Sequence, residues 1–308
     1  MRRLFRNLSK RIRSRIKRTL GLPPYSRYVQ ELVIIATRRT GSSFLADCLR
    51  SFPDALSLRE VYNPSGTTGS RRVVSALERR SGRSFAGWRD KALIEWARSD
   101  PMRHWKMLAA IARAQGKTLL SFKVFDKHLP ADAAGALIAA RRPAVLFLVR
   151  NRLDVYISAT KAGASSKWAK TDTTGIGLTI TTDAFLRWAE RIDHWYDDML
   201  GHVMTARLPF LVLRYEDHVS GDASHVVQVL GEAFGVLKIR TKRPAAAFPS
   251  SYVRQDRAPT TFDKVANGDA IRAELSSLGK LDYALSPPLV DRVWSGSRAT
   301  APGLQSGN

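Results

Sequence analysis

The residues best suited to chemistry in this sequence form a short polar loop after an apolar run, Thr37-Arg38-Arg39-Thr40-Gly41-Ser42-Ser43. Gly41 allows the backbone to turn sharply and to approach a ligand closely. The Arg39 guanidinium, the two serine hydroxyls and the amides that open a following helix are donors that suit a phosphate or a sulfate. The loop therefore predicts an anion site. The alternative is a serine that only caps a helix, as in any α/β protein.

The same loop argues against two common nucleotide sites. A loop for nucleoside triphosphates reads G-x-x-x-x-G-K-[ST], and the sequence contains no such run. A dinucleotide turn reads G-x-G-x-x-G after a strand, and Gly163, Gly175 and Gly177 do not have that spacing. Six scattered histidines and the single Cys48 indicate no metal site, and one cysteine cannot form an intrachain disulfide.

Short apolar runs alternate with helical patterns and must position this loop. We expect strands at 31–36, 54–58, 119–125, 144–149 and 210–214, and helices at 42–50, 131–140, 153–161 and 183–205, with two or three more over 71–115. Apolar strands without alternation are buried on both faces. The sequence therefore predicts an α/β fold of three layers, with a mostly parallel central sheet flanked by helices.

A second pair of residues gives the anion loop a context. Arg150 ends the strand at 144–149, and Ser158 follows eight residues later on the next helix. Together with Arg39-Thr40-Gly41-Ser42-Ser43-Phe44, this pair resembles the sulfotransferases that use 3′-phosphoadenosine 5′-phosphosulfate, and it is most similar to bacterial carbohydrate sulfotransferases of the nodulation-factor and trehalose type. Three further stretches resemble the family in the same order: 57–63, 213–217, and 252–256 with 265–267.

The resemblance implies a P-loop-like sulfotransferase fold and a role for each matching residue. Residues 39–44 would hold the 5′-phosphosulfate end of the donor, with Arg39 neutralising charge on the departing phosphate. Arg150 and Ser158 would hold its 3′-phosphate. Arg254 and Gln255 would belong to a late loop that covers the nucleotide. No metal is implied, because a sulfuryl group carries less charge than a phosphoryl group.

The acceptor hydroxyl needs a general base, and the sequence offers three candidates. Glu60 is our first choice, because the bacterial enzymes it resembles use a glutamate in this segment. His128 is the rival, and Asp126 is the third. Lys123, in the middle of a strand, is expected to face the transferred sulfate. The resemblance implies a carbohydrate or glycolipid acceptor.

Charge shapes the remaining expectations. The chain carries a formal net charge of +23, and residues 1–27 hold ten Lys or Arg and no acid. The pattern of apolar residues among Lys and Arg in residues 1–20 predicts a basic amphipathic helix that could lie on an anionic membrane surface. The sequence shows neither a secretory signal nor a run of about 20 apolar residues, so we expect a cytoplasmic protein, peripheral on the membrane at most.

We expect a basic helix and linker at 1–27, a sulfotransferase domain at 28–285 and a flexible tail at 286–308. Two alternatives stay open: a nucleotide-dependent kinase, and a non-catalytic basic module that binds membrane or nucleic acid. No basic recognition helix and no aromatic RNA-binding motif supports nucleic acid as a partner. The sequence does not indicate an oligomeric state.

Overall fold

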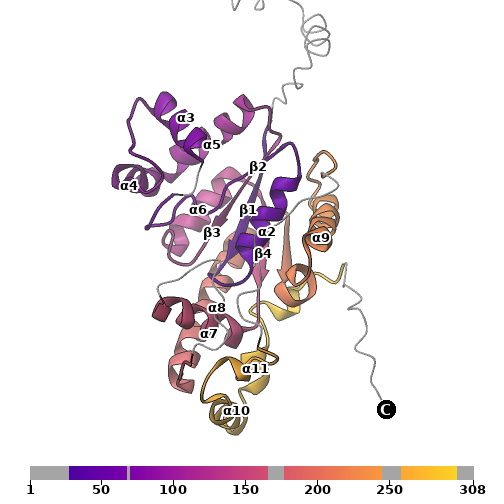
Figure 1. The fold of residues 1–308 in the computed structure, drawn as a ribbon. Helices are drawn as coiled ribbons and strands as arrows, with labels where there is room; N and C mark the ends of the chain where they lie inside the picture. The colour runs from indigo at the N-terminus through magenta and orange to yellow at the C-terminus, as the bar shows by residue number, and fades with distance from the viewer. Residues whose placement is uncertain (1–27, 68–69, 166–176, 245–257, 297–308) are drawn as a thin grey trace, which may run out of the picture.

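Five parallel strands form the centre of the computed structural model (Figure 1), which describes residues 28–67, 70–165, 177–244 and 258–296. The strand order is β2-β3-β1-β4-β5. The strands are β1 (Gln30–Ala36), β2 (Ala55–Ser57), β3 (Leu119–Val124), β4 (Ala144–Val149) and β5 (Phe210–Arg214). The predicted parallel sheet is confirmed, and every strand expected from the sequence is present.

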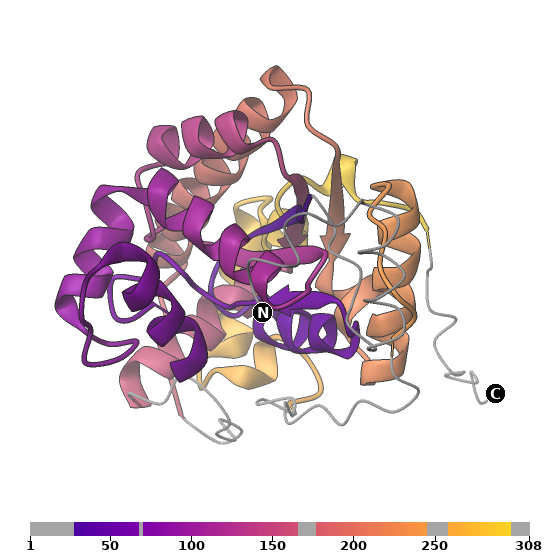
Figure 2. The same ribbon diagram turned by 90° about the horizontal axis from the view of Figure 1, so that it is seen from above.

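Helices cover both faces of this sheet, as Figure 2 shows from above. Most lie at the predicted positions; α9, α10 and α11 were not assigned from the sequence. The helices are α2 (Ser42–Cys48), α3 (Arg71–Ser81), α4 (Lys91–Ser99), α5 (Pro101–Ala114), α6 (Ala131–Arg141), α7 (Arg152–Ser165), α8 (Thr182–Thr205), α9 (Ala223–Val236), α10 (Gly268–Ser277) and α11 (Leu281–Leu285).

The pleat of the strands explains why the core divides into two layers. Val33 and Ile35 of β1 point into a cluster with α3–α6 and α8, whereas Leu32 and Ile34 point into a cluster with α2 and α9. A third, smaller cluster joins α7, α8, α10 and α11. Each β1 residue from Leu32 to Ala36 is fully buried, as expected of a strand with helices on both sides.

The strand order places β1 at the point where the chain changes direction across the sheet. β1 pairs with β3 on one side and with β4 on the other, with Ile34 opposite both Lys123 and Leu146. Ligands of open α/β sheets bind beyond the carboxyl ends of the strands at such a point. The loop after β1 is therefore where the fold itself favours a ligand.

The described part of the predicted C-terminal tail contacts the domain. Val293 pairs with Val212 of β5, and the amide of Trp294 donates to the Val212 carbonyl at 2.9 Å. The Trp294 ring stacks on His218 with 5.6 Å between centroids. Residues 286–296 are thus attached to the edge of the sheet. The predicted N-terminal helix at 1–20 lies outside the described residues.

None of the helices in the described ranges is long and apolar enough to cross a membrane.

Candidate active site

The loop between β1 and α2 has an unusual backbone, with a positive φ at two of its residues. Gly41 precedes α2 with φ +85°, and Arg39 also has a positive φ, 73°. A Cβ on Gly41 would lie 2.6 Å from the ring of Tyr215, so only glycine fits. The Thr40 hydroxyl donates to the Thr37 carbonyl at 2.8 Å and closes the turn.

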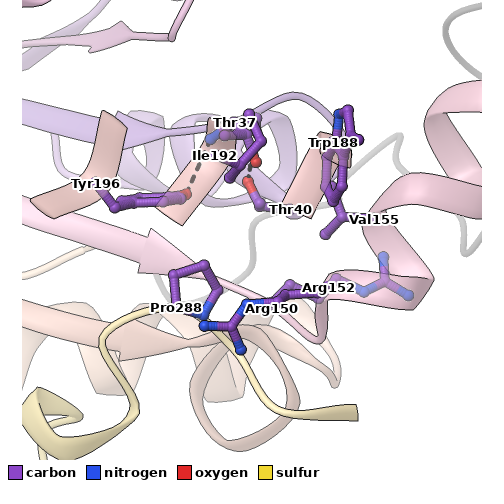
Figure 3. Close-up of a pocket in the computed structure, with 9 residues that line it drawn as sticks. All are labelled: Thr37, Thr40, Arg150, Arg152, Val155, Trp188, Ile192, Tyr196 and Pro288. Carbon is purple, nitrogen blue, oxygen red and sulfur yellow. Dashed lines mark hydrogen bonds between the residues drawn. The ribbon is translucent and has the colours of Figure 1, made fainter. Parts of the chain in front are cut away.

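Tyr196 of α8 fixes the start of the same loop from the face of the sheet that α3–α6 and α8 cover. Its hydroxyl accepts a hydrogen bond from the Thr37 amide at 3.0 Å and donates to the Leu148 carbonyl of β4 at 2.8 Å. Figure 3 shows this hydroxyl pointing at Thr37, with Thr40 beside it and Arg150 across a small pocket. Because Tyr196 is buried, the position of the loop relative to β4 is set by the core.

The first group of polar side chains lies on the β3 side of the loop. Lys123 of β3 is completely buried, and its Nζ lies 3.0 Å from Ser43 Oγ and 3.5 Å from Ser42 Oγ. The same Nζ lies 3.1 Å from Glu60 Oε1. The structure thus brings together the predicted sulfate-facing lysine, the first-choice base and two serines of the anion loop.

His128 stands behind Glu60. Its Nδ1 accepts a hydrogen bond from the Phe125 amide at 3.2 Å, so in the neutral ring the proton is on Nε2. That Nε2 lies 3.8 Å from Glu60 Oε2, which also accepts a hydrogen bond from Asn63 Nδ2 at 2.6 Å. His128 is buried and Glu60 is partly exposed, so Glu60 is the more accessible of the two candidate bases.

Electrostatics fixes the charges of this first group. Burial favours the protonated form of Glu60, but the neighbouring His128 N–H and the positive charge of Lys123 outweigh it and lower the pKa of Glu60 to about 2. Burial lowers the pKa of His128, against the attraction of Glu60. Glu60 is therefore a carboxylate and His128 a neutral imidazole at neutral pH. Burial also lowers the pKa of Lys123.

The second group lies on the β4 side of the loop. Arg39 Nε donates to Ser158 Oγ of α7 at 2.9 Å. Arg150 Nη1 donates to the Arg39 carbonyl at 3.2 Å, and its Nη2 lies 3.2 Å from Asp154 Oδ2. The Arg150 guanidinium also stacks over the Tyr215 ring at 4.3 Å. Burial and the charge of Arg150 lower the pKa of Arg39.

Most of the residues predicted for the site fall into these two groups, which flank one loop. Arg39 was predicted to act on the departing phosphate, but its side chain lies with the pair predicted for the 3′-phosphate. Asp126 acts on the first group through its negative charge, which favours the charged form of His128 against the effect of burial. Arg254 and Gln255 lie outside the described residues, so their predicted role stays a prediction.

Three residues of the two groups were not singled out from the sequence. Asp154 lies four residues after Arg150, and this helical spacing is a signal that could have found it. Lys264, whose Nζ lies 2.5 Å from Asp154 Oδ1, comes from a distant segment and gives no such signal. The third, Asn63, is part of the 57–63 stretch, where only Glu60 was assigned a role.

Aromatic side chains can stack on sugar rings, and the aromatic residues between β2 and α8 were therefore compared by their exposure. Tyr62 and Trp105 are completely buried and pack edge-on against Phe122. Trp88 is 41% exposed, and Trp168 lies outside the described residues. Within the described residues, no group of His, Cys, Asp or Glu is arranged to hold a metal ion.

A parallel α/β sheet in the order 2-3-1-4-5, with a cationic glycine loop after β1, is an arrangement that suits an anionic ligand. The family model of the sulfotransferase domain matches residues 30–235, about two thirds of the chain. The chain therefore belongs to the sulfotransferase domain family, and the protein is a sulfotransferase. A comparison with curated proteins gives no match.

Proposed function

We propose that this sulfotransferase uses 3′-phosphoadenosine 5′-phosphosulfate as its donor and sulfates a hydroxyl of a carbohydrate or glycolipid. The observation that best supports this donor is the pair of cationic groups, one on each side of the loop after β1. Lys123 lies with Ser42 and Ser43 on one side, and Arg39 lies with Arg150 and Ser158 on the other. A donor with phosphates at both ends of its ribose suits two such groups.

The donor supplies an activated sulfuryl group. Sulfuryl transfer resembles phosphoryl transfer, in which a planar group passes in line between two oxygens. The acceptor oxygen bonds to sulfur while the bond from sulfur to the 5′-phosphate oxygen breaks. Lys123 and the amides of residues 40–43 stabilise the charge that grows on that oxygen, and Arg39 adds its charge from the other side. The Phe44 amide, which was also expected to contribute, donates to the Gly41 carbonyl at 3.0 Å instead.

Glu60 is the proposed base. It is a carboxylate at neutral pH, and its distance from Lys123 places it beside the lysine expected to face the sulfate. Its low pKa makes it a weak base in the ground state. In the reaction it needs to accept the acceptor proton only as that hydroxyl becomes acidic in the transition state. Buried His128 would then orient Glu60 and would not itself take the proton.

Features of the sequence support the proposed acceptor class and the proposed location. The resemblance to carbohydrate sulfotransferases favours a glycan or glycolipid. We propose a cytoplasmic protein whose residues 1–20, with their basic and apolar pattern, lie against an anionic membrane surface. No metal is required in this proposal, because the cationic side chains supply the electrostatic stabilisation.

Titration calorimetry with 3′-phosphoadenosine 5′-phosphate tests the donor. We expect binding to this nucleotide to be at least tenfold tighter than to adenosine 5′-phosphate, and no binding of ATP with magnesium or of RNA at similar concentrations. Preference for ATP with magnesium would support the kinase alternative, and preference for RNA or vesicles alone would support the non-catalytic one. Radiolabelled donor and a cell-envelope extract, followed by separation of labelled products, would then identify the acceptor.

A further inference from the structure

Lys264 is a buried lysine next to the second cationic group. It ends a short 3₁₀ turn, η4 (Phe262–Lys264), and only 6% of its side chain is exposed. Its Nζ lies 2.5 Å from Asp154 Oδ1. The family model ends at residue 235, so Lys264 lies beyond the matched region. An ammonium group is rarely buried unless a specific partner balances it.

One carboxylate serves two cations here. Asp154 Oδ1 accepts from Lys264, and Asp154 Oδ2 accepts from Arg150 Nη2 at 3.2 Å. Burial favours the protonated form of Asp154, but the charges of Arg150 and Lys264 outweigh it and lower the pKa of Asp154. Asp154 is therefore ionised at neutral pH and fixes the spacing between a residue of η4 and one at the end of β4.

The charges of this group do not cancel. Arg150 and Lys264 share one carboxylate, which leaves a formal surplus of one positive charge (2 − 1), and no further carboxylate of the described residues lies within 4.0 Å of either cation. In addition, Arg150 Nε is buried and has no hydrogen-bond partner among the described residues.

A purely structural ion pair would be neutral and fully hydrogen-bonded, because buried surplus charge and unpaired donors are unfavourable. A phosphate monoester carries about −1.5 to −2 charges near pH 7 and has several acceptor oxygens. It therefore matches the surplus positive charge of this group, and its oxygens could accept a hydrogen bond from Arg150 Nε. A phosphodiester or a free ribose hydroxyl carries less charge and does not.

We propose that Lys264 and Asp154 are positioning and specificity-determining residues for the terminal 3′-phosphate of the donor. Lys264 supplies the additional positive charge, and Asp154 holds Lys264 and Arg150 at a fixed spacing around that phosphate. The inference rests on the proposed donor. If the two residues only connect η4 to α7, removing them should weaken the binding of every nucleotide equally or unfold the chain. If they select the 3′-phosphate, removing them should weaken the binding of the bisphosphate more than that of adenosine 5′-phosphate.

The test is the ratio of two dissociation constants, those for adenosine 5′-phosphate and for 3′-phosphoadenosine 5′-phosphate, measured by calorimetry on the full chain. Lys264→Met should lower this ratio about tenfold, as expected for loss of one close charge, mainly by weakening the bisphosphate. Lys264→Arg keeps the charge and should keep the ratio within about threefold. The matched control is Lys280→Met, an exposed lysine over the Tyr283 ring, which should leave the ratio unchanged.

An unchanged ratio in Lys264→Met, with normal discrimination in the wild type, would overturn the inference and leave the proposed donor intact. A wild type that does not discriminate between the two nucleotides would overturn the donor and this inference together. If Lys264→Met does not fold, Lys264→Gln removes the same charge while keeping a polar end, and its ratio decides between the same outcomes.

Discussion

Arg39 and Ser158 are joined by a hydrogen bond of 2.9 Å between Nε and Oγ, although one follows β1 and the other lies on α7. The sequence had placed them at opposite ends of the donor, Arg39 at the phosphosulfate and Ser158 at the 3′-phosphate. Their contact gives the loop after β1 a direct connection to the β4 side of the site. If the proposed donor is right, the Arg39 side chain would meet it from the side of the residues proposed for the 3′-phosphate.

Ser158→Ala is expected to weaken binding of 3′-phosphoadenosine 5′-phosphate about five- to tenfold, because it removes a hydroxyl donor and the anchor of the Arg39 side chain. Binding of adenosine 5′-phosphate should change less than twofold. Calorimetry on both nucleotides measures this difference. Thr160→Ala is the matched control on α7, because its hydroxyl donates within the helix, to the Tyr156 carbonyl. Equal losses for both nucleotides would argue that Ser158 is structural.

The base assignment predicts unequal effects of two conservative substitutions. Glu60→Gln should lower the rate of transfer at saturating donor and acceptor by about 10²- to 10⁴-fold, the usual contribution of general base catalysis. His128→Gln should lower it by less than about tenfold. Single-turnover assays with radiolabelled donor measure both rates, and unchanged donor affinity of each variant shows that the site has folded. The reverse order of the two effects would make His128 the base.

The two candidate bases also predict different pH dependences. The pKa of Glu60 is about 2, so with Glu60 as base kcat/KM should be flat from about pH 5 to pH 7. His128 must be neutral to act, and burial lowers its pKa from the usual 6.5, so with His128 as base any fall in activity would come only at a pH below that usual value, as the ring takes up a proton. The measurement is kcat/KM across this range in wild type and His128→Gln. A decrease of kcat/KM toward low pH that is present in the wild type and absent in His128→Gln would contradict the assignment of Glu60 as the base.

Glycine at position 41 is expected to be indispensable. Gly41→Ala combines a positive φ with a Cβ that would meet the Tyr215 ring, so it should destabilise the fold by at least about 1–2 kcal/mol and abolish tight nucleotide binding. Gly231→Ala in α9 is the control, because its Cβ meets no atom within 4 Å and alanine favours a helix. Urea unfolding compares the two. Normal stability of Gly41→Ala would show that the loop adopts another backbone.

The fold could be predicted from the sequence largely because its strands are buried on both faces. The runs at 144–149 and 210–214 contain almost no polar residues, and the structure places β4 and β5 at the same residues. Helix α9 was not predicted, because Gly231 and Gly235 lower the helical propensity of its second half. Short α10 and α11 depend on packing against α7 and α8, which no local pattern reveals.

The contacts within the site were predictable only where the residues are close in sequence. Arg150 directly follows β4, and Ser158 lies eight residues later on the next helix, α7. Their spacing in the sequence therefore indicated that both belong to one site. The contact between Lys123 and Glu60 depends instead on the register of β2 and β3, in which the Lys123 amide donates to the Arg59 carbonyl at 2.8 Å. Lys264 reaches Asp154 only through the packing of the C-terminal helices. Neither contact follows from residue spacing.

The strand order separates the two groups of the site along the chain. Glu60, Lys123 and His128 all precede β4, whereas Arg150, Ser158 and Lys264 all follow it, and the loop after β1 touches both sets. Residues 64–118, between the Glu60 segment and β3, contain none of these side chains. A chimera that exchanges this block alone would keep every proposed donor contact. Such an exchange would have to preserve the packing of Trp96 and Trp105 in the core that they share with β3, and the hydrogen bond from Arg98 Nε to the His128 carbonyl at 3.1 Å.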